Sequence, residues 1–109
     1  MIDEQEFRLR CDATLDDLYR ALVQAADEHE FDVDQQAGAL SVEFDEPKAK
    51  FVVSPNAPVR QIWVSALVKS FKFDWNPDRD AFVLPDSGAT LKDLMGEVIS
   101  TQLGETVKL

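Results

Sequence analysis

Carboxylates crowd the first third of this sequence. Residues 1–36 hold eleven acidic residues and three arginines, which accounts for −8 of the formal net charge of −10 over 109 residues. Carboxylate oxygens suit hard, hydrated divalent cations, and a surface rich in them also attracts basic proteins. The segment therefore predicts weak binding of several cations such as Fe²⁺ or Mn²⁺, or docking onto a positively charged protein. An acidic face that serves solubility alone is the third interpretation.

The other residue types exclude tighter metal sites and the common catalytic centres. The chain has one histidine, His29, and one cysteine, Cys11, which are too few for a tetrahedral zinc site. It contains no EF-hand loop, no nucleophile elbow and no glycine-rich phosphate loop. Cys11 falls on an apolar helical stripe, so we expect it to be buried. His29 is expected to lie at the surface without binding a metal.

One tryptophan marks a second surface. Gln61–Ala66 alternates between apolar and polar positions, so the strand expected there places Gln61, Trp63 and Ser65 on its outer side. A large aromatic side chain on a solvated sheet offers contact area and an N–H donor at a low entropic cost. This pattern predicts a protein-binding surface, unless a loop or the C-terminal tail covers the indole.

Two helices and a run of strands must position these residues. Apolar residues at steps of three and four predict helices over Glu4–Ala26 and over Leu91–Leu103, the second with Thr90 as its N-cap and Gly104 as its stop. A loop is expected at Ser54–Pro58. Alternating patterns predict six strands, over the second half of 28–34 and over residues 40–45, 48–53, 61–66, 69–75 and 81–84.

This order of elements predicts an α+β fold over a single domain, residues 1–109. The connections between strands are too short for parallel crossovers, so the sheet is expected to be antiparallel. We expect a two-layer α/β sandwich in the order α-β-β-β-β-β-β-α. Its N- and C-terminal helices would pack on one face of the sheet and leave the other face to solvent.

Charge and composition narrow the partners. A net charge of −10 repels nucleic-acid phosphates and anionic lipid, so neither nucleic acid nor a membrane surface is expected as a partner. The acidic start, Met1–Glu6, and the short apolar runs predict neither an export signal nor a membrane span. With a single cysteine besides, the cytoplasm is the expected compartment.

Several stretches resemble the frataxin family, in particular its bacterial, CyaY-type branch. The most specific is Asn56–Ser65, which reads NAPVRQIWVS and is similar to the family's N-K-Q-x-P-x-x-Q-I-W-L-S signature. Gly38–Phe44, Phe73–Trp75 and Asp86–Leu94 add to the resemblance, as does the acidic first helix. The family pattern differs at Leu67–Ser70, where it has a glycine-containing turn and this chain has no glycine.

The resemblance implies a function that composition alone does not. Frataxins bind iron weakly, as Fe²⁺ or Fe³⁺ and with other divalent cations possible. They modulate the cysteine desulfurase–scaffold machinery that builds iron–sulfur clusters. The acids that would bind iron and a basic desulfurase surface are Asp12, Asp16, Asp17, Asp27, Glu28, Glu30, Asp32 and Asp34. The residues that would meet the scaffold protein are Asn56, Gln61, Trp63 and, as the basic neighbour of the tryptophan, Lys72.

The expected function is therefore that of a monomeric iron-binding regulator of iron–sulfur cluster assembly, with oligomerisation under iron load left open. A weak ferroxidase is one alternative, although the chain lacks the Glu-x-x-His pairs of a diiron centre. A metal-independent acidic interaction module is the other alternative.

Overall fold

In the computed structural model, which describes residues 2–109, the first apolar stripe forms helix α1 over Glu4–Ala26. Asp3 caps the helix, because its carboxylate accepts the backbone N–H of Glu6 at 2.8 Å. The buried side of α1 consists of the residues that the spacing predicts, namely Phe7, Cys11, Leu15, Leu18, Leu22 and Ala25. The helix is therefore held by one face and exposes the other.

Helix α2 spans Leu91–Leu103, and both of its predicted ends are confirmed. Thr90 and Asp93 form a reciprocal capping box, in which the Asp93 N–H donates to Thr90 Oγ1 and the Thr90 N–H donates to the Asp93 carboxylate, each at 3.2 Å. Gly104 ends the helix with φ 70°, a left-handed conformation that glycine adopts without strain.

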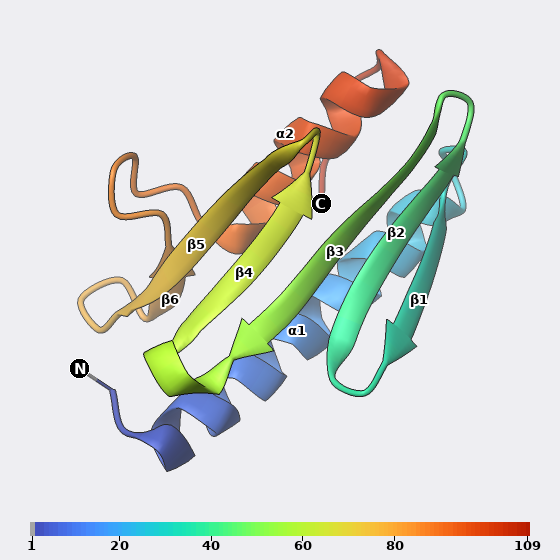
Figure 1. Ribbon diagram of the computed structural model, residues 1–109. Helices are drawn as coiled ribbons and strands as arrows, with labels where there is room; N and C mark the ends of the chain where they lie inside the picture. The colour runs from blue at the N-terminus through green and yellow to red at the C-terminus, as the bar shows by residue number, and fades with distance from the viewer. Residues whose placement is uncertain (1) are drawn as a thin grey trace.

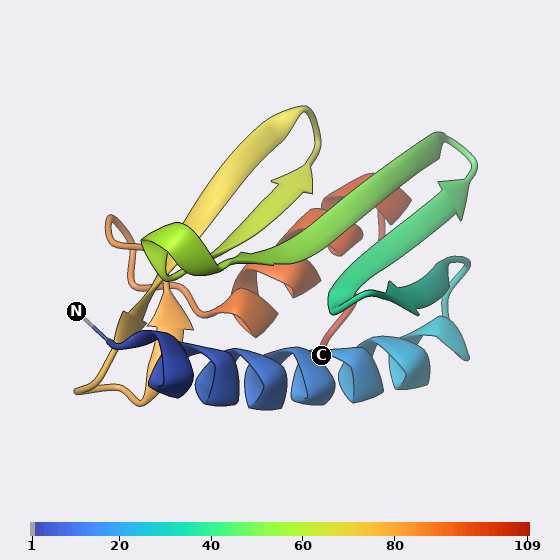
Figure 2. The same cartoon turned by 60° about the horizontal axis from the view of Figure 1, so that its bottom comes forward.

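The strands form one antiparallel sheet in sequence order, β1 to β6, and both helices lie behind it in the view of Figure 1. This arrangement confirms the predicted two-layer fold. From the side, α1 runs along one edge of the helical layer and the sheet lies over it (Figure 2). The strands are β1 (Asp32–Gln36), β2 (Ala39–Asp45), β3 (Lys48–Asn56), β4 (Gln61–Ala66), β5 (Lys69–Asn76) and β6 (Ala81–Val83).

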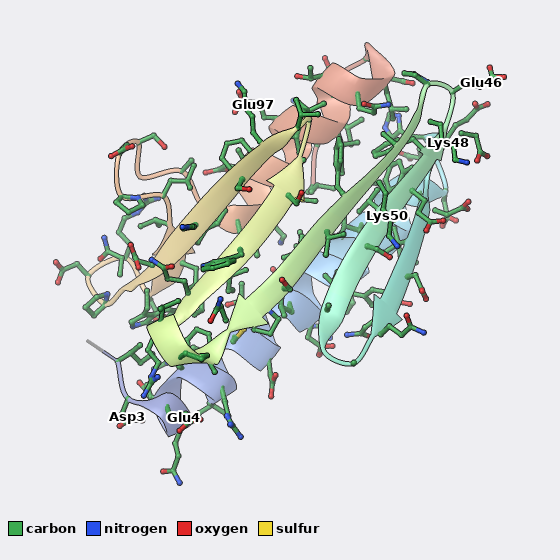
Figure 3. All side chains as sticks on the ribbon, viewed as in Figure 1. Asp3, Glu4, Glu46, Lys48, Lys50 and Glu97 are labelled. Atoms are coloured by element: carbon green, nitrogen blue, oxygen red, sulfur yellow. The ribbon has the colours of Figure 1, made fainter. Side chains whose placement is uncertain are left out.

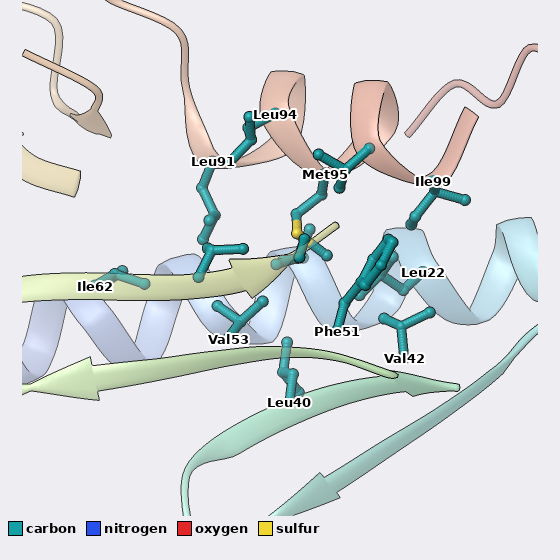
Figure 4. Close-up of a cluster of buried hydrophobic side chains, with 14 of the residues drawn as sticks. Leu22, Leu40, Val42, Phe51, Val53, Ile62, Leu91, Leu94, Met95 and Ile99 are labelled. Atoms are coloured by element: carbon teal, nitrogen blue, oxygen red, sulfur yellow. The ribbon is translucent and has the colours of Figure 1, made fainter. Parts of the chain in front are cut away.

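The core lies between the two layers. In Figure 4 side chains of α2, such as Met95 and Ile99, point toward Phe51 and Val42 of the sheet and toward Leu22 of α1. All five are at most 1% exposed. Burial of this kind removes apolar surface from water at roughly 25 cal/mol per Å², and it holds the outer faces of α1 and the sheet in fixed positions.

Strand β3 is longer than the sequence predicts. The loop expected at Ser54–Pro58 is wrong, because β3 continues to Asn56 and only Ala57–Val59 form a short 3₁₀ helix, η1. Asn56 consequently pairs with Gln61 across the sheet.

Pro55 is tolerated in β3 because the strand has a partner on only one side there. Pro55 lies opposite Ile62 of β4, whereas pairing with β2 ends at Val53, opposite Leu40. Proline lacks an N–H and fits a strand where one edge makes no ladder. The proline that suggested a loop therefore marks the point where β2 and β3 part.

Candidate functional site

Helix α1 presents the first group of predicted metal residues to solvent. Its buried stripe faces the sheet, so Asp12, Asp16 and Asp17 are all exposed. Asp12 and Asp16 are four residues apart and therefore neighbours on the helix surface, where like charges cost about 0.2–0.5 kcal/mol. These acids weaken the helix slightly, so helix stability does not account for them.

The remaining predicted metal residues follow where α1 ends. Asp27 is the C-cap of α1, Glu28 and Glu30 lie in the connection, and Asp32 and Asp34 lie on the edge strand β1. All five are exposed. The last turn of α1 contains no basic residue, although a helix C-terminus favours cations. The local field is thus unfavourable to these acids as well.

We call the eight predicted metal residues the acidic ridge. One of them is paired: Asp17 Oδ2 lies 2.8 Å from Lys92 Nζ of α2. Within residues 2–109 the other seven make no ion pair, and Asp16 does not pair with Arg20 although the two lie four residues apart on α1. The acidic ridge consists of Asp12, Asp16, Asp17, Asp27, Glu28, Glu30, Asp32 and Asp34.

The acidic ridge forms an extended strip along α1, the connection that follows it and β1. No group of three or more His, Cys, Asp or Glu side chains in the described part of the chain is placed to hold a metal ion. Asp12 and Asp27 alone are separated by about 22 Å of helix axis. Such a strip attracts cations or a basic surface through its summed field. A role of these residues in binding iron stays a prediction.

His29 lies beside Glu30 and Asp32 of the acidic ridge but contacts a different acid. The residue is partly buried, and its Nδ1 lies 3.1 Å from Glu105 Oε2, near the C-terminus. This contact ties the end of α1 to the segment that follows α2. It gives His29 a structural role, and the expectation that it binds no metal stays a prediction.

Trp63 lies on the sheet face that neither helix covers. The residue is 37% exposed, and its indole N–H donates to Gln61 Oε1 at 2.9 Å. Gln61 in turn donates through Nε2 to Asp74 Oδ1 at 2.9 Å. The Lys72 ammonium lies 4.8 Å from the centre of the indole ring, a cation–π contact with the residue directly opposite on β5.

These contacts hold the indole in place while leaving part of it accessible. The C-terminal tail, a candidate to cover it, packs elsewhere, because the Val107 N–H donates to Ser100 Oγ of α2 at 2.8 Å. The structure therefore brings together three of the four predicted partner-binding residues by contact and the fourth, Asn56, by strand pairing. We call Asn56, Gln61, Trp63, Lys72 and Asp74 the sheet patch.

Asp74 is the one member of the sheet patch that the sequence does not predict. It lies between two aromatic residues in a strand whose register against β4 cannot be read from the sequence. Once Gln61 is paired with Asp74, the link between them becomes evident. The signal that was available is the alternation of β5, which places Asp74 on the same side as Lys72.

The β4–β5 turn next to the sheet patch is strained. Leu67 and Val68 form its two residues, with φ 53° and 56°. A left-handed conformation costs about 1–2 kcal/mol for a residue other than glycine, and Val68 is fully exposed, so it gains no packing in return. Hairpin turns with two positive φ angles prefer Asn-Gly. The missing glycine thus leaves the turn geometry in place at a cost in stability.

Cys11 is a buried, unreactive thiol. It is 2% exposed on the inner side of α1. Burial, and secondarily the negative charge of Asp12, raises the pKa of this thiol from 9.0 to about 12. The nucleophilic thiolate is therefore scarce at neutral pH, and the expected role of Cys11 in core packing is confirmed.

The sequence model of one protein family, described as a frataxin-like domain, matches residues 1–105. The chain belongs to the frataxin-like family. The resemblance that the Asn56–Ser65 stretch suggests is thereby confirmed. No helix within residues 2–109 is long and apolar enough to cross a membrane.

Relatives of this frataxin-like chain include two proteins named iron–sulfur cluster assembly protein CyaY. The one from Janthinobacterium sp. (strain Marseille) is 32% identical over 108 residues, which cover 97% of this chain and 95% of the relative. The one from Azotobacter vinelandii is 31% identical over 96 residues, 86% of each chain.

A solved structure agrees with the frataxin-like fold. The frataxin from Psychromonas ingrahamii, described as part of the CyaY protein family, matches with a TM-score of 0.76 and 25% sequence identity. The match covers 98% of this chain and 97% of the other. The two-layer architecture is therefore shared over nearly the whole chain.

Proposed function

We propose that this protein acts in iron–sulfur cluster assembly as a cytoplasmic, iron-binding regulator of the cysteine desulfurase–scaffold complex. The observation that carries the proposal is the pairing of two separate surfaces in one frataxin-like domain. One is an exposed acidic strip with seven carboxylates that make no ion pair among the described residues 2–109, and the other is a pre-positioned tryptophan on the open sheet face. The names of the CyaY relatives support the assembly role.

The acidic ridge would hold Fe²⁺ loosely, as cargo. Exposed carboxylates that lack a closed ligand set bind hydrated cations weakly and release them readily. The same charges would pair with lysines and arginines of the desulfurase. Bound cation should therefore weaken docking, and added salt should weaken it further.

The sheet patch would contact the scaffold protein. Its indole is already oriented by Gln61 and Asp74, so little side-chain freedom is lost on binding. Partly exposed aromatic anchors of this kind tend to contribute much of the affinity at protein interfaces.

An NMR titration tests the proposal. The ¹⁵N-labelled protein is titrated under anaerobic conditions with Fe²⁺, and separately with the desulfurase and the scaffold protein. We expect Fe²⁺ and the desulfurase to affect resonances of α1 and β1, and the scaffold protein to shift the Trp63 indole resonance. If neither Fe²⁺ nor the desulfurase affects α1, the role assigned to the acidic ridge is wrong.

The two alternatives give different results in the same series. A metal-independent interaction module would leave the ridge resonances unchanged with Fe²⁺ while the desulfurase still binds. Because residues 2–109 contain no preformed coordination site, this alternative is favoured over the ferroxidase. A weak ferroxidase would consume oxygen with Fe²⁺ above the buffer rate and lose this activity when ridge acids are replaced by alanine.

A further inference from the structure

The basic residues of the chain are distributed as unevenly as the acidic ones. Residues 47–73, which form β3, η1, β4 and most of β5, contain no carboxylate, whereas the rest of the chain carries all twenty-one. In a protein with a net charge of −10, this segment of the sheet therefore carries only basic charges, with Glu43 of β2 and Asp74 of β5 at its borders. The five basic residues of this segment are Lys48, Lys50, Arg60, Lys69 and Lys72.

A shallow hollow of about 340 Å³ lies in this segment, on the sheet face that the helices leave open. Four further hollows described on the molecule each have at least one carboxylate in their lining, and this one has none. Two rows of paired residues across β3, β4 and β5 supply its outer lining, Val52–Ser65–Ser70 and Ser54–Trp63–Lys72.

The shape of the hollow follows from these rows. Val52, Ser65 and Ser70 are small, so they leave a depression beside the larger Trp63 and Lys72. In the described chain the hydroxyls of the serines in both rows donate to no protein acceptor, unlike the Ser100 hydroxyl, which bonds to Gly96 O at 2.7 Å. The floor is apolar and the rim offers free hydrogen-bonding groups.

The charge at the rim is positive. Lys72 makes no ion pair within residues 2–109 and lies over the Trp63 ring. Lys50 is the next outward-facing residue of β3 after Val52, and Figure 3 shows it on the strand beside the labelled Lys48. Its exposed partner Glu43 is 3.7 Å away, a loose surface pair.

We propose that this hollow binds a segment of a partner protein in which an aliphatic side chain stands next to carboxylates. The aliphatic group would cover the apolar floor beside Trp63, and a carboxylate would pair with Lys72. Charge complementarity selects this partner, because a basic segment would be repelled here and attracted by the acidic ridge. This inference rests on the proposed function, which assigns the scaffold protein to the sheet patch, and it adds the chemistry of the contact.

The test measures how charge reversal at each of two lysines changes the affinity for the scaffold protein. Lys72→Glu reverses the charge at the hollow, and Lys108→Glu makes the same change in the exposed C-terminal tail, which packs against α2. We expect Lys72→Glu to weaken binding about tenfold, a loss of about 1.4 kcal/mol, and Lys108→Glu to weaken it less than twofold. Lys72→Arg keeps the charge and should stay within twofold of the unchanged protein.

A second arm uses eight-residue peptides as probes. A peptide of alternating leucine and glutamate should shift the amide resonances of Ser54, Ser65 and Ser70 and the Trp63 indole. Its leucine–lysine counterpart should leave these resonances in place. Thermal unfolding of each variant checks that the fold is retained.

The outcomes separate this inference from the proposed function. If Lys72→Glu and Lys108→Glu weaken scaffold binding equally, or neither does, the inference is overturned. If Trp63→Ala abolishes binding while Lys72→Glu has no effect, the inference fails and the scaffold contact survives. If Trp63→Ala also leaves binding unchanged, the scaffold contact itself is refuted. A leucine–lysine peptide that occupies the hollow as well as the acidic one overturns the assigned charge preference.

Discussion

Seven of the eight acids of the acidic ridge make no ion pair within residues 2–109, whereas four of the five residues of the sheet patch are joined by two hydrogen bonds and a cation–π contact. Both surfaces are exposed, and both are held by the same core. The acidic ridge consists of charges spread along a helix and an edge strand. The sheet patch consists of side chains in defined positions relative to one another.

This difference predicts how each surface responds to change. A field summed over many exposed charges is screened by salt and loses little when one charge is removed. A pre-positioned aromatic anchor depends on one side chain, and its apolar contact is not screened by salt, so only the Lys72 contribution should weaken as salt is added.

Replacing the indole should have the largest effect. We expect Trp63→Ala to weaken binding to the scaffold protein about a hundredfold, or about 2.7 kcal/mol, and thermal unfolding checks that the variant keeps its fold. Biolayer interferometry with immobilised scaffold protein measures the affinity. Trp63→Phe is the control and should give an intermediate affinity. A Trp63→Ala variant within twofold of the unchanged protein would contradict the role of the indole.

Neutralising the acidic ridge should act in proportion to the charge removed. We expect Asp12→Asn, Asp16→Asn, Glu28→Gln and Asp32→Asn together to weaken desulfurase binding about tenfold at low salt, and each change alone to weaken it less than threefold. In high salt the difference should vanish. The check is isothermal titration calorimetry at two ionic strengths. A single substitution that accounts for the whole loss would show that the acidic ridge works through defined contacts.

The buried side of α1 carries the single thiol of the chain, which should make stability depend on pH. Because the pKa of Cys11 is raised from 9.0 to about 12, the folded protein keeps a proton above pH 9 that the unfolded chain releases. The free energy of unfolding should therefore fall as pH rises from 9 toward 12, by about 1 kcal/mol at pH 10.

Urea unfolding at pH 8 and pH 10 measures this fall, with Cys11→Ala as the control that lacks the thiol. The two proteins differ only at this side chain, so the difference between their pH responses isolates the thiol of Cys11. An identical fall in the two proteins would mean that the thiol of Cys11 does not cause it.

Relieving the strained turn should have the smallest effect. Val68→Gly removes the cost of a β-branched residue at φ 56° and should raise the free energy of unfolding by about 1 kcal/mol. Thermal unfolding measures the gain. Affinities for the desulfurase and the scaffold protein should stay unchanged, since the turn belongs to neither surface. Weaker scaffold binding by Val68→Gly would instead place the exposed turn inside the interface.

The architecture could be predicted because its signals are local. The apolar spacing of α1, the capping box at Thr90 and the alternation of the strands each depend on residues close in sequence. The end of β3 could not be predicted in this way, since Pro55 is a strand residue only because β2 has already separated from β3. Local chemistry suggested a loop, and long-range pairing decided otherwise.

The two candidate surfaces also differ in how far local sequence signals predict them. By itself the sequence determined that the acidic residues gather in the first third of the chain and that Trp63 points away from the core. Both conclusions follow from composition and from the two-residue period of a strand, which are properties of residues close in sequence. Only the tertiary structure decided that Gln61, Asp74 and Lys72 surround the indole. That outcome depends on the register of β4 against β5, where a shift of one residue would turn each side chain to the other face.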